Sequence, residues 1–422
     1  MSTIGGSVLI VAPFWRHAPH VGIHRVERFV RWLHESGVRI VLVRAGGTEN
    51  VTATEWGTEI TVRDPIGLYR DPDGPRAPVW RRGRSRLRRL ATLALFSPDA
   101  TIPWARQVID HPLVLAHGSG AEWVVASSPP ESVHVAAAAL ARRLKAKLLV
   151  DLRDGWLDEP NKPFLRLLPL RRWHEGRLEA RSLGQADRVL VTSEGWRRQL
   201  VRRRPEVGPK VHVLTNGYPA HDLPRGGERP AATSGVLELL YTGQFTYSRS
   251  TQRPRLMLEP LWLAGRPGGR QGNIELVGNL SPEDLAEVDA WRARLADVGW
   301  RVGVHGPVQR NEALGRMRRA DGLLLLSASD AAIPSKTFEY LPSGRPILTV
   351  TNKGGALWEL GEQVPQMFLS DPRDPRGSLT RVQAFLDACA NPHHDYVPPQ
   401  QFTDSALARQ FREFLGLPRS PR

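Results

Sequence analysis

The sequence predicts an α/β protein with two Rossmann-like, doubly wound domains, and three observations support this class. The chain has 422 residues, more than one hydrophobic core usually holds together. Short apolar runs alternate with amphipathic helical segments, which is typical of a parallel sheet covered on both faces. The alternation occurs twice, on either side of a segment rich in Pro, Gly and Arg. We therefore expect a first domain over residues 1–220, a linker over 221–235, a second domain over 236–401 and a final segment over 402–422.

The first domain contains six apolar runs that predict strands, and the last one ends at the turn signal Thr215-Asn216-Gly217. Amphipathic stretches between these runs predict the crossover helices. The segment between residues 45 and 112 is rich in Pro and Arg, so we expect an irregular insertion over the sheet edge. The expected strands are 7–12, 39–43, 123–126, 147–152, 188–192 and 211–214, and the expected helices are near 23–35, 133–144 and 171–183.

The second domain repeats the pattern with five apolar runs and three helical stretches. In doubly wound sheets, ligands bind beyond the carboxyl ends of the strands. A cleft between the two domains is therefore the expected site. The expected strands are 237–242, 274–277, 301–304, 322–326 and 346–350, and the expected helices are near 255–263, 282–298 and 311–319.

The charge and the cysteine content of the chain limit the kinds of partner and cellular compartment that we expect. The net charge is +15, and most of the excess lies in the first 220 residues, with the densest Arg run at 81–89. An anionic membrane surface, an acidic acceptor, nucleic acid and a merely solvated loop all remain open for that run. A single cysteine, Cys389, excludes an intrachain disulfide. No apolar stretch approaches the length of a membrane span and no signal peptide is evident, so we expect a cytoplasmic protein, with peripheral contact to the inner membrane face left open.

The segment 334–346 carries the most specific local signal. An apolar run at 323–326 precedes it, and Ser335 is placed to cap a short helix whose free N–H groups would face an anion. Lys336 adds a positive charge there, and Glu339 lies on the same side as Ser335. A diphosphate and a ribose diol would fit this spacing. An ordinary capped helix with a surface Lys and Glu is the alternative.

Seven segments of the chain, taken in their order along the sequence, resemble the family 4 nucleotide-sugar glycosyltransferases of the GT-B architecture. Each motif alone is weak, whereas their order over most of the chain is specific. The segments are 127–130, 151–156, 186–193, 216–217, 241–245, 275–278 and 335–346.

The resemblance implies a donor site in the second domain and an acceptor site in the first. Arg249 and Lys336 would face the diphosphate of a nucleotide-sugar, Glu339 would hold the ribose, and the loop 305–308, which ends at Val308, would contact the base. Gly243 would let backbone approach the phosphates. The family has a further acidic residue where this chain has Ala331, and the final helix is implied to cross back to the first domain.

Glycosyl transfer develops negative charge on the leaving phosphate, and fixed cations stabilise it without a metal ion or other cofactor. The predicted catalytic residues are therefore Arg249 and Lys336, with Arg153 and Asp154 in a loop after a buried strand. Asp154 would be the base in an inverting reaction. The resemblance implies retention instead, with the leaving phosphate taking the acceptor proton.

Gly22 and His117 are the remaining acceptor-side candidates, on loops expected to face the cleft. A plain turn for Gly22 and ordinary packing for His117 are the alternatives. The Asp-x-Asp pattern at 71–73 and the His pair at 393–394 lie among Pro residues and predict surface turns. No Gly-x-Gly-x-x-Gly or Walker motif is present, which argues against NAD and ATP as ligands.

The sequence therefore predicts a hexosyl or related glycosyltransferase acting on a sugar, lipid-linked, polysaccharide or natural-product acceptor, without nucleic acid as a partner. An epimerase of the same fold, or a non-enzymatic basic protein that binds membranes or nucleic acid, are the competing hypotheses. The donor base and sugar, the acceptor, the anomeric outcome and the oligomeric state are not predicted.

Overall fold

The structure is a computed structural model, and it describes residues 6–17, 22–69, 96–159, 162, 164–219, 221, 235–246, 251–265, 270–391 and 396–417. The chain divides into two compact units. Unit 1 consists of Met1–Thr192, Trp196–Thr215 and Ala408–Arg422, and unit 2 of Ser193–Gly195 and Asn216–Leu407. Of the expected linker at 221–235, only residues 221 and 235 are described, and the Arg run at 81–89 lies outside the described residues.

Unit 1 is built on an eight-stranded sheet in the order β3-β4-β2-β1-β5-β6-β7-β8. The chain moves from β1 outward to β2 and later returns to place β5 on the other side of β1, which is the switch of a doubly wound sheet. The strands are β1 (Ser7–Val11), β2 (Arg39–Gly46), β3 (Asn50–Thr54), β4 (Gly57–Arg63), β5 (Trp123–Ser128), β6 (Lys147–Leu152), β7 (Arg188–Val191) and β8 (Val211–Val213).

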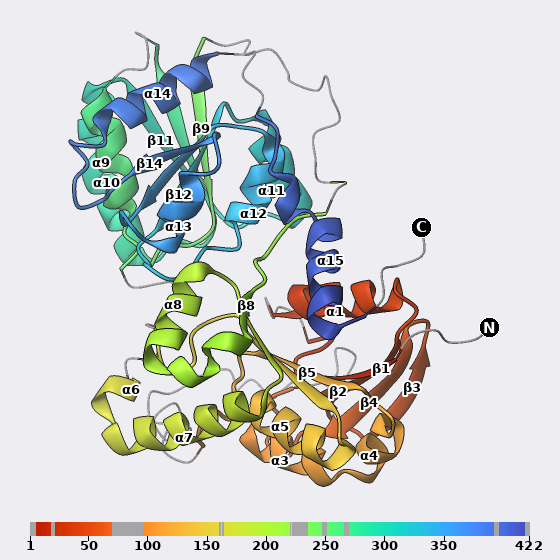
Figure 1. The fold of residues 1–422 in the computed structure, drawn as a ribbon. Helices are drawn as coiled ribbons and strands as arrows, with labels where there is room; N and C mark the ends of the chain where they lie inside the picture. Colours follow the sequence, from red (N-terminus) through yellow and green to blue (C-terminus); the bar gives the residue numbers. More distant parts are fainter. Residues whose placement is uncertain are drawn as a thin grey trace. The chain divides into compact units, whose positions relative to one another are not determined.

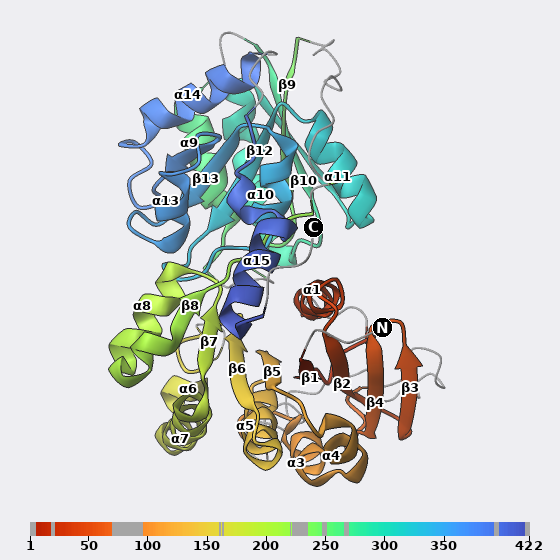
Figure 2. The ribbon, with the colours of Figure 1, turned by 45° about the vertical axis from the view of Figure 1, so that its right-hand side comes forward.

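Helices cover both faces of this sheet, with α3, α4 and α5 on one face and α1 on the other (Figure 2). The part of α15 that belongs to unit 1 packs beside α1, where Phe411 stacks on Phe29 with ring centroids 4.3 Å apart. The helices are α1 (Ile23–His34), α3 (Ile102–Asp110), α4 (Pro112–Gly118), α5 (Ser132–Leu144), α6 (Phe164–Leu167), α7 (Pro169–Gln185), α8 (Glu194–Arg203) and α15 (Asp404–Leu415).

The expectation of an irregular insertion over 45–112 is wrong for its described part. β3 and β4 form an antiparallel pair, and β4 continues the parallel sheet beside β2. β4 has four consecutive buried residues, 59–62, which include Ile60 and Val62, so it is a strand within the sheet rather than a loop above it. Helices α3 and α4 also lie in this region.

Unit 2 is a six-stranded, fully parallel sheet in the order β11-β10-β9-β12-β13-β14. Its strands are β9 (Leu237–Thr242), β10 (Gly272–Val277), β11 (Trp300–His305), β12 (Gly322–Ser327), β13 (Ile347–Thr351) and β14 (Met367–Ser370). Helices α9 (Pro254–Ala264), α10 (Pro282–Asp297) and α14 (Leu379–Ala390) lie on one face, and α11 (Arg310–Arg319) and α12 (Thr337–Tyr340) on the other (Figure 1).

β12 shows why this sheet must be covered on both sides. Leu324 and Leu326 belong to the core cluster under α9, α10 and α14, whereas Leu323 and Leu325 belong to the opposite cluster. α13 (Ala356–Gly361) adds Leu357 and Leu360 to that opposite cluster. The continuous apolar run of β12 is therefore the sequence signature of a strand buried on both faces. The fold class predicted from the sequence, two doubly wound α/β domains, is confirmed.

The start of helix α10 (Pro282–Asp297) is fixed by a side-chain cap. Ser281 Oγ accepts a hydrogen bond from the Asp284 backbone N–H, and the Asp284 carboxylate accepts one from the Ser281 N–H, both at 3.0 Å. This reciprocal pair is a capping box. Of the helices in the described part of the chain, none is both long and apolar enough to cross a membrane.

Candidate functional site

Lys336 lies at the carboxyl edge of the unit 2 sheet, just before α12. Its ammonium donates hydrogen bonds to Tyr241 Oη and to the Thr242 carbonyl oxygen, both at 2.9 Å. The Nζ atom also lies 4.2 Å from the centroid of the Tyr241 ring. Three contacts to the end of β9 therefore fix a positive charge where the sheet topology places ligands.

Gly243 leaves room for that ammonium. A β-carbon at residue 243 would lie 2.6 Å from Lys336 Nζ, and the φ angle of +121° disfavours any L side chain. Gly278, with φ +151°, is equally constrained, because its β-carbon would lie 1.9 Å from the Gly243 carbonyl oxygen. The two glycines let the ends of β9 and β10 approach each other next to the charge.

Burial sets the protonation of the groups around Lys336. It lowers the pKa of the Lys336 ammonium to about 8, and the nearby negative charge of Glu339 opposes this shift. Burial raises the pKa of the Tyr241 and Tyr340 hydroxyls, so both stay protonated. Tyr241 Oη donates to the Gln244 carbonyl oxygen at 2.8 Å, and Tyr340 Oη accepts from the Thr242 N–H at 2.8 Å. The two phenols thus hold the end of β9 that Lys336 contacts.

Glu339 is half-buried, and its carboxylate has no hydrogen bond or ion pair with any residue that the structure describes. Its carboxylate is therefore an acceptor not used within the described parts of unit 2. It lies in α12, three residues after Lys336. A half-buried charge that the described fold leaves unsatisfied is a binding candidate rather than a structural one.

The expected role of Ser335 as a helix cap is wrong. Lys336 occupies the N-cap position, no side chain caps the helix, and Ser335 is exposed. The N–H groups of Thr337, Phe338 and Glu339 already bond to carbonyl oxygens one turn back. α12 has four residues and thus offers no row of free N–H groups, so the Lys336 ammonium, not a helix terminus, is the anion-attracting group.

The other donor-side candidates fall into three cases. Val308 follows β11 in a loop, is half-buried and packs against the core cluster that contains Leu357 and Leu360. Ala331 is buried and its side chain has no charged group, and the neighbouring Asp330 accepts from Asn352 Nδ2 at 2.7 Å. Arg249 lies outside the described residues, as do 71–73 and 393–394.

Unit 1 contains a buried ion pair that the sequence analysis did not single out. Arg25 in α1 makes a two-pronged contact with the Asp151 carboxylate, from Nε at 2.8 Å and from Nη2 at 2.7 Å. Ser127 Oγ donates to the same carboxylate at 2.6 Å, and Arg25 also donates to the carbonyl oxygens of Leu214 and Thr215. One buried guanidinium thus ties α1 to β6 and to the segment after β8.

Arg153 and Asp154 follow β6 at the carboxyl edge of the unit 1 sheet, as expected. Arg153 Nε donates to the Ser128 carbonyl oxygen at 2.8 Å, and Thr192 Oγ1 donates to the Arg153 carbonyl oxygen at 2.8 Å. Burial lowers the pKa of Arg153, and the carboxylates of Asp154 and Asp151 oppose this shift. Asp154 is half-buried and has no hydrogen-bond or ion-pair partner among the described residues. These two residues are the unit 1 candidates.

The expectation that His117 lies on a loop facing ligands is wrong. His117 is in the last turn of α4, which leads into the amino end of β5, at the opposite edge of the sheet from Arg153 and Asp154. Gly22 is the N-cap of α1 with φ −64° and ψ −24°, a conformation open to any residue. The structure therefore supplies no backbone reason for glycine at position 22, and residues 18–21 lie outside the described part.

His134 in α5 is fully buried, and neither ring nitrogen has a hydrogen-bond partner in the described structure. Its ring lies 5.9 Å from that of Trp156. Burial lowers the pKa of His134 to about 3, with the Lys162 charge adding to this shift and the Asp151 charge opposing it. The imidazole is therefore neutral at physiological pH.

This histidine predicts a pH dependence of stability. Its folded pKa of about 3 lies below the usual value of 6.5, so below pH 6.5 the unfolded chain takes up a proton that the folded chain does not. The free energy of unfolding should fall by about 1.4 kcal/mol per pH unit from about pH 6 downward. Urea unfolding of the wild type and of His134→Leu between pH 5 and pH 7 measures this. The variant should lose this part of the slope, and parallel curves for the two proteins would contradict the assignment.

Residues 22–217 match the family model of the glycosyl transferase 4-like domain. This match places residues 22–217, the first half of the chain, in the glycosyl transferase 4-like family. Comparison with curated proteins gives no match. The glycosyl transferase 4-like region covers nearly all of the described unit 1 apart from β1 and α15.

Solved structures share the fold of this chain over nearly its whole length. Anabaena HepE in complex with UDP and glucose has 13% identity and a TM-score of 0.59, with 97% of this chain and 99% of that chain covered. The lipopolysaccharide outer core galactosyltransferase WaaB has 13% identity, a TM-score of 0.56 and the same coverage. A trehalose-phosphate synthase from Burkholderia xenovorans in complex with glucose-6-phosphate has 13% identity and a TM-score of 0.61, with 97% and 100% covered. The GT-B architecture expected from the sequence is confirmed.

Three residues of the chain, Arg25, Tyr241 and Tyr340, have a sequence signal for a buried polar contact. Arg25 stands on the apolar stripe of its helix, four residues before Phe29, and a charge on a buried stripe requires a partner. Tyr241 and Tyr340 place hydroxyls in segments that are otherwise apolar or buried, and a buried phenol seeks a hydrogen bond. Nothing in the sequence pattern indicates that His134 is buried without a partner.

Proposed function

We propose that this glycosyltransferase moves a hexosyl or related group from a nucleoside-diphosphate sugar to an acceptor hydroxyl, with retention and without a metal ion or other cofactor. The observation that carries the donor site is the Lys336 ammonium, fixed beside Gly243, with the Glu339 carboxylate left without a partner in the described structure. A cation and an unused acceptor, three residues apart, match a diphosphate joined to a ribose.

In the proposed reaction the bond between the anomeric carbon and the leaving phosphate oxygen breaks as the acceptor oxygen bonds to that carbon. The acceptor proton passes to the leaving phosphate, which keeps charge and atoms in balance. Lys336, together with Arg249, would stabilise the charge developing on the phosphate. Glu339 would accept hydrogen bonds from the ribose, and Ser335 and the Val308 loop would line the rest of the donor site.

Unit 1 would bind the acceptor, with Arg153 and Asp154 at the carboxyl edge of its sheet and Gly22 at the start of α1. Asp154 would serve as a base only if the reaction inverts the anomeric centre. A lipid-linked or polysaccharide acceptor is favoured by the basic first half of the chain, and it implies peripheral contact with a membrane surface from the cytoplasmic side.

Nucleotide release tests the reaction type. UDP-, GDP- and TDP-hexoses would be incubated with a panel of p-nitrophenyl glycosides as acceptors, and free nucleoside diphosphate would be measured. We expect release that depends on the acceptor, that is unchanged by EDTA, and a product whose anomeric proton coupling in NMR matches that of the donor. A donor converted to a stereoisomer with its nucleotide still attached would show an epimerase instead.

A further inference from the structure

One side of α7 in unit 1 carries exposed residues of an unusual kind. Leu170 and Trp173 are 79% and 58% exposed, and Arg177 and Arg181 continue the same stripe at helical spacing. The Arg177 guanidinium lies 4.9 Å from the centroid of the Trp173 ring. The outer stripe of this helix therefore begins apolar and ends cationic.

The short connection before α7 extends the apolar part. Leu167, the last residue of α6, is 78% exposed, and Leu168 is 47% exposed. Four of the eight large apolar side chains that are exposed in the described structure thus fall within seven consecutive residues. Scattered exposed leucines are normal, whereas a group of this kind marks a binding surface. We call Leu167, Leu168, Leu170, Trp173, Arg177 and Arg181 the α6–α7 surface.

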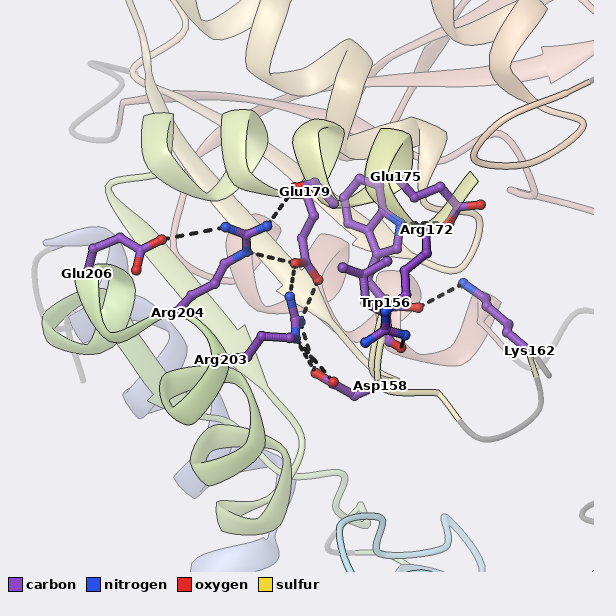
Figure 3. A network of polar contacts seen from close by, with 11 residues as sticks. Trp156, Asp158, Lys162, Arg172, Glu175, Glu179, Arg203, Arg204 and Glu206 are labelled. Carbon is purple, nitrogen blue, oxygen red and sulfur yellow. Dashed lines mark hydrogen bonds and ion pairs between the residues drawn. The ribbon is translucent and has the colours of Figure 1, made fainter. Parts of the chain in front are cut away.

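The acidic residues of α7 are on the opposite side of the helix. Glu175 and Glu179 are fully buried, and both are neutralised from within unit 1. Glu175 accepts from Arg171 at 2.8 Å and from Trp156 Nε1 at 3.3 Å. Figure 3 shows Glu179 facing Arg203 and Arg204, and Arg204 Nε donates to it at 2.8 Å. No carboxylate of α7 is left to offset the positive charge of its outer stripe.

We propose that the α6–α7 surface binds an anionic phospholipid bilayer. Exposed Leu and Trp side chains enter the boundary between headgroups and acyl chains, while arginines on the same face pair with lipid phosphates. Charge complementarity favours a lipid surface over a protein partner, since α7 presents cations without a compensating carboxylate. The apolar half of the surface would be left in water on a nucleic acid.

The α6–α7 surface would be the part of unit 1 that makes the membrane contact included in the proposed function. Arg171 donates to the carbonyl oxygens of Phe96 and Pro98, so the described chain after residue 95 contacts α7. The Arg run at 81–89 itself lies outside the described residues. Vesicle binding requires neither donor nor acceptor, so its outcome is separate from that of the transfer reaction.

Vesicle co-sedimentation of the full chain tests the proposal. The wild type should bind phosphatidylcholine vesicles containing about one third phosphatidylglycerol, bind pure phosphatidylcholine weakly, and detach as salt is raised. Leu170→Asn with Trp173→Asn should lower binding about tenfold. Arg177→Ser should lower it about fivefold. All these side chains are exposed, so the melting temperatures should not change.

Two matched variants control for general effects of the substitutions. Val397→Asn alters a residue that is 82% exposed in unit 2. Arg381→Ser removes an exposed arginine that also lies near a tryptophan ring, 5.5 Å from the centroid of Trp358. Both controls should bind vesicles like the wild type. The proposal is overturned if the α6–α7 variants bind vesicles as tightly as the controls, or if only substitutions in 81–89 abolish binding. It is also overturned if the wild type does not bind vesicles and the surface mediates protein association instead.

Discussion

Replacing Lys336 with Met is expected to weaken binding of nucleoside diphosphates about 100-fold. The substitution keeps the length of the side chain but removes the charge of Lys336 beside Gly243. A charge-assisted hydrogen bond to a phosphate contributes about 1.5–3 kcal/mol, and the loss is of that order. Isothermal titration calorimetry with UDP, GDP and TDP measures it.

The same substitution should leave the free energy of unfolding nearly unchanged. Burial destabilises the charged ammonium, as the lowered pKa of Lys336 shows. Removing this buried charge stabilises the fold and offsets the loss of the hydrogen bonds to Tyr241 and Thr242. Lys353→Met is the matched control, since Lys353 is exposed in the same unit. Equal loss of affinity in the two variants would count against a specific role of Lys336.

The lowered pKa also gives the affinity a pH profile. Phosphate binds the charged lysine, so affinity should be constant from pH 7 to about 8 and then fall as Lys336 loses its proton, by up to about tenfold per pH unit. The fall ends where the pKa of the complex is reached, since bound phosphate raises it. Lys336→Met should show no such decline. A decline of equal steepness in that variant would assign the titration to another group.

Replacing Arg25 with Met is expected to lower the free energy of unfolding by about 3–5 kcal/mol. Arg25 and Asp151 are both buried, and removal of the guanidinium leaves a carboxylate in the core with Ser127 as its remaining hydrogen-bond partner among the described residues. Urea unfolding at pH 7 measures the loss. Combining Arg25→Met with Asp151→Asn removes the orphaned charge and should recover a large part of it.

Arg31→Met on the same helix is the matched control. Arg31 and Glu35 form an exposed pair at 3.9 Å, so this substitution should cost less than about 0.5 kcal/mol. A small loss for Arg25→Met, comparable to that of the control, would show that the buried pair does not hold α1 to β6.

Most of the fold could be predicted because each buried parallel strand leaves a continuous apolar run, as in β1 and β12. β3 could not, because its five residues are almost all exposed and are held only by pairing with β4. β4 in turn is defined by pairing with β2, which no local pattern specifies. Edge strands of this kind depend on tertiary contacts rather than on their own composition.

The site could be predicted in part, because Gly243 and Lys336 each follow an apolar run, and the carboxyl ends of parallel strands share one sheet edge. The two residues are 93 positions apart in the sequence, and they lie close together because β9 and β12, which precede them, are neighbouring parallel strands. The capping role of Ser335 could not be judged, because helix start is decided by backbone geometry and α12 begins two residues later. His117 was misplaced because a short helix precedes β5, and its sequence contains Pro and Gly, which also mark loops.

A crystal structure of the chain with a bound nucleoside diphosphate tests the donor site most directly. We expect phosphate oxygens within hydrogen-bond distance of Lys336 Nζ, and a ribose hydroxyl within the same distance of the Glu339 carboxylate. A nucleotide bound elsewhere, with Lys336 still donating only to Tyr241 and Thr242 and Glu339 without a ligand, would contradict the assignment.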